Sequence, residues 1–231
     1  DMATRSTSSQ KNVGIRGSCA GLPTILTKIC TFVQTQCSVV LEVWRSVKSE
    51  MADELLHASG RHTDISASST DRATIFLVDI LSDGIWSPIA RALEAKFGAQ
   101  LFSFAQPDQF HSNFLSCRRF LEHDLPNAVN ATQEERKQLW SHAVTSHFWS
   151  LWSLPIYFGL RQKGLMDDLE EATLTFAGQT AVQQGQGPGR VAATCIQHCW
   201  DRDKVFLDWL APQFFQLSLE LGDKYTSWFE T

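Results

Sequence analysis

The chain has 231 residues, of which 43% are hydrophobic, and it carries a formal net charge of -5 at pH 7. A chain of this length buries about 70% or more of the surface that its unfolded form exposes, so its fold requires no disulfide or structural metal. The negative charge argues against nucleic-acid binding through phosphate contacts, and no polybasic segment exists to bind an anionic membrane surface. No apolar run reaches the roughly 18 residues that a membrane-spanning helix requires.

The six cysteines are scattered along the chain, at Cys19, Cys30, Cys37, Cys117, Cys195 and Cys199. Such a scatter in a long chain is typical of reduced thiols in the cytosol and not of a disulfide framework. We therefore expect a cytosolic protein.

Residues 1–21 are rich in Ser, Thr, Gly and basic residues and show no periodicity, which indicates a flexible leader. After them, apolar residues recur at intervals of three and four, at Leu22, Ile25, Leu26, Ile29, Val33, Cys37, Val40, Val43, Val47, Met51 and Leu55. This spacing predicts one amphipathic helix over 22–58, roughly 55 Å long. A helix of that length suits a bundle strut, and we interpret it as the end of an upstream helical rod. A polar linker around Gly60 follows.

A carboxy-terminal helical-bundle domain is expected over 71–231. Its first helix is predicted over 71–97, where Pro88 either kinks the helix or marks its restart. Gly98 is expected to end it.

The next helix is predicted over 107–124, because Pro107 suits the first helical position. Pro126 and Asn127 are expected to close it. In the helix after that, Thr132 and Glu135 have the spacing of a capping box, and the apolar pattern continues to Trp152.

The stretch WSLPIYFGLR, residues 152–161, places a proline inside an apolar run. We expect Pro155 in the first turn of a helix, with Ser153 as its cap. Ile156, Tyr157 and Leu160 then share a packed face, while Arg161 reaches solvent.

Residues 184–190 are expected to form a loop. The last helix is the most regular, with Phe206, Leu210, Phe214, Leu217, Leu221, Tyr225 and Trp228 in a seven-residue repeat typical of bundles. A second apolar set, Leu207, Phe215 and Leu219, indicates either a central helix or one that meets a partner protein. No alternating stretch with hairpin turns is found, so the predicted fold class is all-α, an elongated helical bundle.

Cys195, His198 and Cys199, within CIQHC, are the strongest candidate metal ligands, because a helix places Cys195 on one face with both others. A structural zinc site needs a fourth ligand, and no second Cys/His pair has ligand spacing. Buried thiols beside Trp200 are the favoured interpretation.

Three other patterns carry less weight. His142 and His147 are five residues apart and diverge on a helix. Gly185, Gly187 and Gly189 follow no strand, and Pro188 among them lacks a donor for a phosphate. The acids Asp167, Asp168, Glu170 and Glu171 are typical of a solvated helix face. We expect no catalytic, cofactor-binding or metal site and therefore no enzyme, and the protein-binding residues stay unassigned.

Three segments resemble one family when taken in order. They are IWSPIARALE (85–94) with LFSFAQPDQFHSNFLSCRRFLE (101–122), then SLPIYFGLR (153–161) with LEEA (169–172), and finally CWDRDKVFLDWLAPQFFQLSLELGDKYTSWF (199–229). In this order and spacing the region 71–231 resembles the carboxy-terminal region of the subunit 2 family of the conserved oligomeric Golgi complex.

The resemblance implies a non-enzymatic, helical subunit of a vesicle-tethering complex, peripheral to the cytosolic face of the Golgi membrane. It implies a role in intra-Golgi retrograde transport and Golgi organisation, with the other subunits of the complex as partners and Rab and SNARE proteins downstream. It implies no cofactor, nucleic acid or small-molecule substrate. The alternatives are a subunit of another helical tether such as the exocyst, and a small helical metalloprotein using Cys195, His198 and Cys199.

Overall fold

The computed structural model describes residues 21–59, 79–177 and 187–230, and every element over these ranges is helical, with no strand among them. The elements are α1 (Leu22–Gln36), α2 (Ser38–Ser59), η2 (Ile80–Trp86), α4 (Ser87–Leu101), α5 (Pro107–Arg119), η3 (Phe120–Asp124), α6 (Leu125–Ala128), α7 (Gln133–Ser141), α8 (Ala143–Ser150), α9 (Leu154–Ala177), α10 (Pro188–Cys199), η4 (Asp208–Leu210) and α11 (Ala211–Phe229). The all-α prediction is confirmed. The predicted leader, apart from Gly21, and the predicted linker around Gly60 lie outside the described residues.

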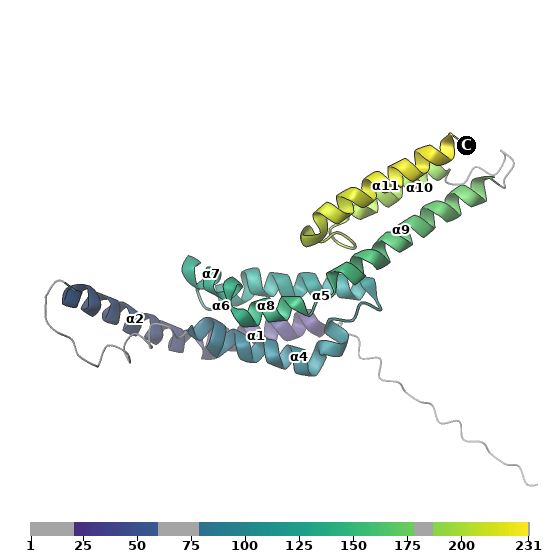
Figure 1. Ribbon diagram of the computed structural model, residues 1–231. Helices are drawn as coiled ribbons and strands as arrows, with labels where there is room; N and C mark the ends of the chain where they lie inside the picture. Colours follow the sequence, from purple (N-terminus) through teal and green to yellow (C-terminus); the bar gives the residue numbers. More distant parts are fainter. Residues whose placement is uncertain (1–20, 60–78, 178–186, 231) are drawn as a thin grey trace, which may run out of the picture.

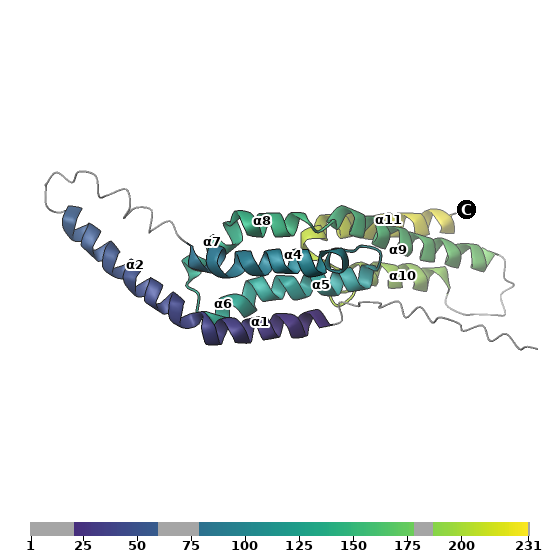
Figure 2. The ribbon, with the colours of Figure 1, turned by 90° about the horizontal axis from the view of Figure 1, so that it is seen from below.

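The molecule is elongated, with two groups of helices placed end to end (Figure 1). The first group contains α1 and α4 to α8, and the second contains α9, α10 and α11. Figure 2 shows that α2 leaves the first group at the end opposite to the second group. The proposed division into a rod helix and a domain over 71–231 stays a prediction, but α1 itself packs on the first group.

The predicted continuous helix over 22–58 is wrong, because the chain bends by 52° between α1 and α2, at Cys37. Hydroxyl groups along α1 donate to carbonyls four residues earlier, from Thr27 to Pro23 (2.9 Å), Thr31 to Thr27 (3.1 Å), Thr35 to Thr31 (2.9 Å) and Ser38 to Gln34 (2.8 Å). Such bonds compete with the amide ladder and bend helices. The row of hydroxyls therefore favours a break at the end of α1.

The two helices on either side of this bend, α1 and α2, make separate tertiary contacts with the first group. Leu22, Leu26 and Val33 on α1 are almost fully buried against the first group. On α2, Arg45 pairs with Glu135 at 2.8 Å and also donates to the carbonyl of Val129 at 3.1 Å. On both sides of Arg45 the predicted apolar stripe is exposed, since Val40, Val43 and Val47 are 55%, 59% and 39% exposed.

Two π-helical segments precede prolines inside the helices of the first group. The N–H of Ser87 donates to Ser82, and the N–H of Leu125 donates to Phe120, each five residues earlier. The wider turn changes the hydrogen-bond register directly before Pro88 and Pro126, which lack the donor that a regular helix needs. Pro88 thus lies at a restart, as expected.

Two predicted helix ends are wrong for related reasons. Pro126 does not close its helix, which continues from η3 through α6 to Ala128, because the π-segment accommodates the proline. The turn after it contains Asn130, whose φ is 49°. Gly98 does not end α4, because the last turn carries Leu101, which is 0% exposed and gains more from burial than a helical glycine costs.

The capping box is confirmed: the hydroxyl of Thr132 accepts from the N–H of Glu135, and the N–H of Thr132 donates to the Glu135 carboxylate. The predicted helix up to Trp152 is nevertheless interrupted at His142, which is extended at φ −68° and ψ 141°. Its Nδ1 accepts from the N–H of Val144 and caps α8, and its Nε2 lies 3.1 Å from Asp83. A contact with a distant helix therefore stabilises the break.

The core of the first group is mainly aromatic. The Trp152 ring meets Phe102, Phe110 and Phe114 edge-on, with ring centroids 5.1 to 5.2 Å apart. These side chains come from the end of α4, from α5 and from the turn before α9. Edge-to-face packing of large rings contributes beyond burial alone, so this cluster fixes where α9 leaves the first group.

The second group packs α9, α10 and α11 together through the stripe predicted for the last helix. Phe214, Leu217 and Leu221 are fully buried, although α11 begins at Ala211 and not at Phe206. The predicted loop ends earlier than expected, because α10 begins at Pro188, a residue suited to the first helical turn.

Candidate protein-interaction surfaces

Tyr157 lies at the junction of the two helical groups. Pro155 occupies the first turn of α9, as predicted, and the carbonyl of Ser153 accepts the N–H of Tyr157 at 3.0 Å. The Tyr157 ring is 0% exposed and stacks on Phe110, while its hydroxyl donates to the carbonyl of Val205 at 2.6 Å. Burial raises the pKa of the Tyr157 hydroxyl above its usual value, so the hydroxyl stays protonated and remains a donor.

The Arg161 side chain is mostly buried, at 16% exposed, so the prediction that it extends into solvent is wrong. Its Nε donates to the Tyr157 hydroxyl at 3.2 Å, and its Nη2 donates to Asp108 at 2.6 Å and to the carbonyl of Lys204 at 2.9 Å. Residues four apart on a helix share a face, which places Arg161 beside Tyr157. Burial alone would lower the pKa of Arg161, but the bonds to Tyr157 and Asp108 outweigh it and raise that pKa.

His111 completes the junction from α5. It is 1% exposed, and its Nε2 lies 3.1 Å from the carbonyl of Phe206. A carbonyl only accepts, so Nε2 carries the proton. Burial lowers the pKa of His111 below its usual value and keeps the ring neutral. Together, α5, α9 and the segment before α11 form a hydrogen-bonded joint, which sequence reasoning missed.

The CIQHC residues do not converge. Cys195 and Cys199 face the core of the second group, at 3% and 0% exposed, whereas His198 is exposed on another face of α10. Burial raises the pKa of Cys195 to about 11 and also raises that of Cys199, so both thiols are protonated at pH 7. Within the described ranges, no group of three or more His, Cys, Asp or Glu side chains could hold a metal ion.

The other sequence candidates have structural roles. Glu170 on α9 pairs with Lys224 on α11 at 3.0 Å, and His147 lies 3.5 Å from Glu94. Gly185 lies outside the described residues. An ideal Cβ on Gly189 would lie 2.8 Å from the Tyr225 hydroxyl, so this glycine permits the close approach of α10 to α11.

Exposed apolar residues form short strips on the second group. Phe215 and Leu219 of the predicted second apolar set are 56% and 60% exposed on α11, whereas Leu207 of that set is buried. Ile156 and Leu160 on α9, predicted to pack inside, are 46% and 40% exposed, so that prediction is wrong. Each pair is four residues apart and therefore contiguous on its helix. The α11 strip is the outcome expected of a helix that meets a partner.

No described helix is, by itself, long and apolar enough to cross a membrane. Leu22–Gln36 and Ser38–Met51 satisfy the length and composition test only as a pair bent by 52°.

The second group of helices is similar to a known protein family. Residues 150–231 match the family described as "COG complex component, COG2, C-terminal", and this range contains α9, α10 and α11. Residues 150–231 are thus similar to a COG2 C-terminal domain along the whole of α9, α10 and α11. The matched range includes the junction residues Tyr157 and Arg161 and the exposed pair Phe215 and Leu219.

Two relatives extend the similarity beyond residues 150–231. Conserved oligomeric Golgi complex subunit 2 of Homo sapiens is 26% identical over 211 residues, covering 89% of this chain. The protein of the same name from Arabidopsis thaliana is 25% identical over 177 residues, covering 71% of this chain. The chain spans about a quarter of the length of these relatives, 25% and 22% respectively. No solved structure gives a significant match.

Proposed function

We propose that this chain is the carboxy-terminal part of a non-enzymatic subunit of a Golgi vesicle-tethering complex. The COG2 C-terminal domain over 150–231 carries the proposal, and the two relatives named as subunit 2 of that complex support it. The subunit acts in intra-Golgi retrograde transport and Golgi organisation, at the cytosolic face of the Golgi membrane.

The physical character of the chain supports a role in protein contacts. A tether needs length and faces that bind other proteins, and end-to-end helical groups with uncovered apolar strips supply both. The other subunits of the oligomeric Golgi complex are the proposed direct partners, with Rab and SNARE proteins as further partners on the vesicle and target membranes. The Phe215–Leu219 strip is the proposed contact for a sister subunit.

Affinity purification of the full-length, endogenously tagged protein from cells tests the proposal. We expect the other Golgi-tether subunits to co-purify, and loss of the protein to impair Golgi glycosylation. Recovery of exocyst subunits, or of no tether subunit, would refute the assignment.

Two variants locate the contact within the COG2 C-terminal domain. Phe215→Asp with Leu219→Asp places two charges on the exposed strip, so we expect weaker co-purification of at least one subunit with an unchanged helical circular dichroism signal. Gln213→Asp is the control for added charge on α11, because it places one carboxylate at an exposed position of the same helix outside that strip. Equal recovery of every subunit by the double variant and the control would remove α11 as the contact.

A further inference from the structure

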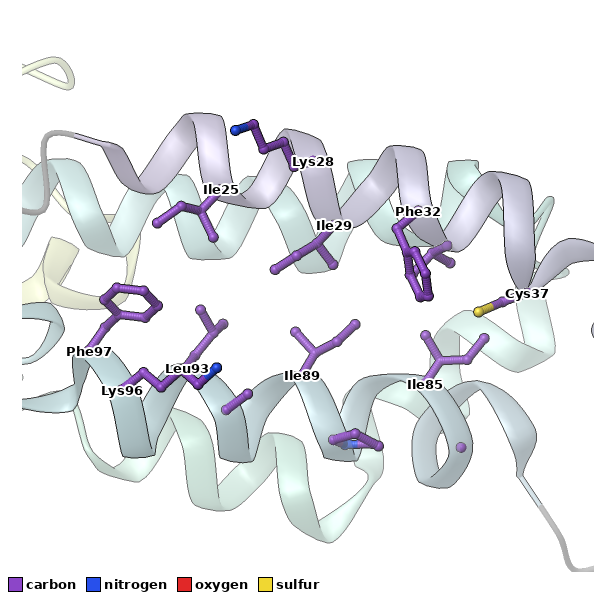
Figure 3. A pocket seen from close by; sticks show the side chains of 14 residues that line it. Ile25, Lys28, Ile29, Phe32, Cys37, Ile85, Ile89, Leu93, Lys96 and Phe97 are labelled. Atoms are coloured by element: carbon purple, nitrogen blue, oxygen red, sulfur yellow. The ribbon is translucent and has the colours of Figure 1, made fainter.

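An apolar groove runs between α1 and α4 on the first helical group. Figure 3 shows the two helices antiparallel, with Ile25 opposite Phe97 at one end and Cys37 near Ile85 at the other. The cavity volume is about 590 Å³, within the roughly 300–1,000 Å³ typical of binding sites. The groove lies outside residues 150–231, and none of the exposed strip residues on α9 and α11 lines it.

The groove is lined almost entirely by carbon. Among the residues described in the structure, its lining consists of Lys28, Lys96, Gly84 and the apolar side chains of Ile25, Ile29, Phe32, Val33, Cys37, Ile85, Pro88, Ile89, Ala92, Leu93 and Phe97. Phe32 is 61% exposed, and Ile25, Ile29 and Ile89 are only partly buried. The apolar stripe of α1 therefore faces open space along one side while its other side packs in the core.

The charges of the groove are one-sided. Lys28 on α1 and Lys96 on α4 both lie in the half of the groove near Ile25 and Phe97 (Figure 3). Both lysines are exposed, and neither has an ion-pair partner among the residues described in the structure. Two unpaired cations beside an apolar trough are complementary to a ligand with one apolar face and acidic groups at one end.

We propose that this groove receives an amphipathic helix of a partner protein, with acidic side chains next to Lys28 and Lys96. From Ile25 to Cys37 the groove is about 18 Å long, which matches a helix of about 12 residues, or three turns. The partner helix places apolar residues at i, i+3, i+4 and i+7 into the groove. The acids sit at the Ile25–Phe97 end and set its direction.

The spacing of the lining favours a helix over a lipid chain. Ile25, Ile29 and Phe32 on α1, and Ile85, Ile89 and Leu93 on α4, recur at three- and four-residue intervals. Such rows form ridges and hollows one helical turn apart, which fit the side chains of a third helix packed alongside. This inference rests on the apolar lining and the two lysines, and it does not depend on the proposed function in a Golgi tether.

A peptide library displayed against the 231-residue chain tests this inference. The peptides are about 12 residues long, with apolar residues at the four anchor positions and with the flanking positions randomised among Glu, Lys and Gln. We expect selected peptides to be enriched in Glu near one end. Binding should depend on Phe32, so Phe32→Asp should abolish it, whereas Leu174→Asp, at an equally exposed leucine of α9, should leave it unchanged.

Charge reversal gives the sharper result. In Lys28→Glu with Lys96→Glu, affinity for the acidic peptides should fall about tenfold, and Glu-to-Lys versions of the same peptides should bind better. Arg91→Glu with Lys163→Glu causes the same change in net charge at exposed sites outside the groove, and should bind as the unchanged protein does.

Several outcomes would overturn the inference. They are a library without acidic enrichment, no selected peptide at all, or equal binding by the groove and control variants. Phe32-dependent binding to phosphatidylserine vesicles that selected peptides do not displace would instead assign the groove to a membrane.

Discussion

The hydroxyl of Tyr157 is the most informative single group to remove from this chain. Tyr157→Phe keeps the ring, its stacking on Phe110 and the volume of the site, and deletes only the oxygen atom. The lost atom donates to the carbonyl of Val205 and accepts from Arg161. The variant therefore isolates the polar part of the joint between the two helical groups.

The expected loss of stability in Tyr157→Phe comes mainly from the carbonyl of Val205, which loses its hydrogen-bond donor. The carbonyl of Val205 loses its Tyr157 hydroxyl donor in a site where Val205 is 8% exposed, and leaving such a buried acceptor unsatisfied costs about 1–3 kcal/mol. Arg161 keeps its bonds to Asp108 and Lys204, so its lost bond adds little. We expect the free energy of unfolding to fall by about 2 kcal/mol. Tyr157→Ala also opens a cavity and should cost about 3–5 kcal/mol.

Urea unfolding followed by far-UV circular dichroism measures both variants against a matched control. Tyr225→Phe removes a hydroxyl from a partly exposed tyrosine of α11 and should change the free energy of unfolding by less than about 0.5 kcal/mol. If Tyr157→Phe is no more destabilising than Tyr225→Phe, the hydrogen-bonded joint does not hold the two groups together.

Other predictions follow from the same structure. Because burial lowers the folded-state pKa of His111, stability should be complete above about pH 6.5 and fall as the pH drops below it, and His111→Gln should flatten this dependence in thermal unfolding. Gly164→Ala, where no atom meets a new Cβ, should stabilise α9 by about 0.5–1 kcal/mol in urea, whereas Gly189→Ala should give a smaller gain or a loss. Iodoacetamide should alkylate partly exposed Cys37 well before buried Cys199 in the native protein, and equal rates by mass spectrometry would contradict the packing of α10.

The sequence correctly predicted those features that depend on residues close together in the chain. The Thr132 capping box, the position of Pro155 in the first turn of α9 and the buried stripe of α11 each depend on residues within one or two turns of each other. Periodicity also indicated a second apolar set on the last helix, typical of either a central helix or one that meets a partner. Phe215 and Leu219 of that set are exposed, whereas Leu207 is buried.

The errors occur where distant contacts decide the outcome. An apolar repeat continues through Cys37, but the chain bends there because α1 packs on the first group and Arg45 ties α2 to Glu135. His142 interrupts a good helical pattern because Asp83, far away in sequence, lies beside its ring. The spacing of apolar residues shows which face of a helix is apolar. It does not show which other helix that face will contact.

The groove between α1 and α4 and the joint at Tyr157 also depend on contacts between residues far apart in the sequence. Ile25 and Ile29 were assigned to an apolar face from their spacing, but the groove exists only because α4 lies opposite them at a distance that leaves room. The joint was missed because an arginine at the end of an apolar run is ordinarily solvated. Its partners, Asp108 and the carbonyl of Lys204, are 53 and 43 residues away.

The bend at Cys37 has a mechanical consequence. With α1 fixed to the bundle and Arg45 clamped to Glu135, the part of α2 from Arg45 to Ser59 is a cantilever about 21 Å long. A rotation of about 10° at the clamp would displace its tip by about 4 Å, since the helix transmits the motion as a stiff lever of that length. A load applied at the far end of α2 would thus reach the bundle first at the Arg45 ion pair and its two bonds to the carbonyl of Val129, and then at the buried side chain of Leu41.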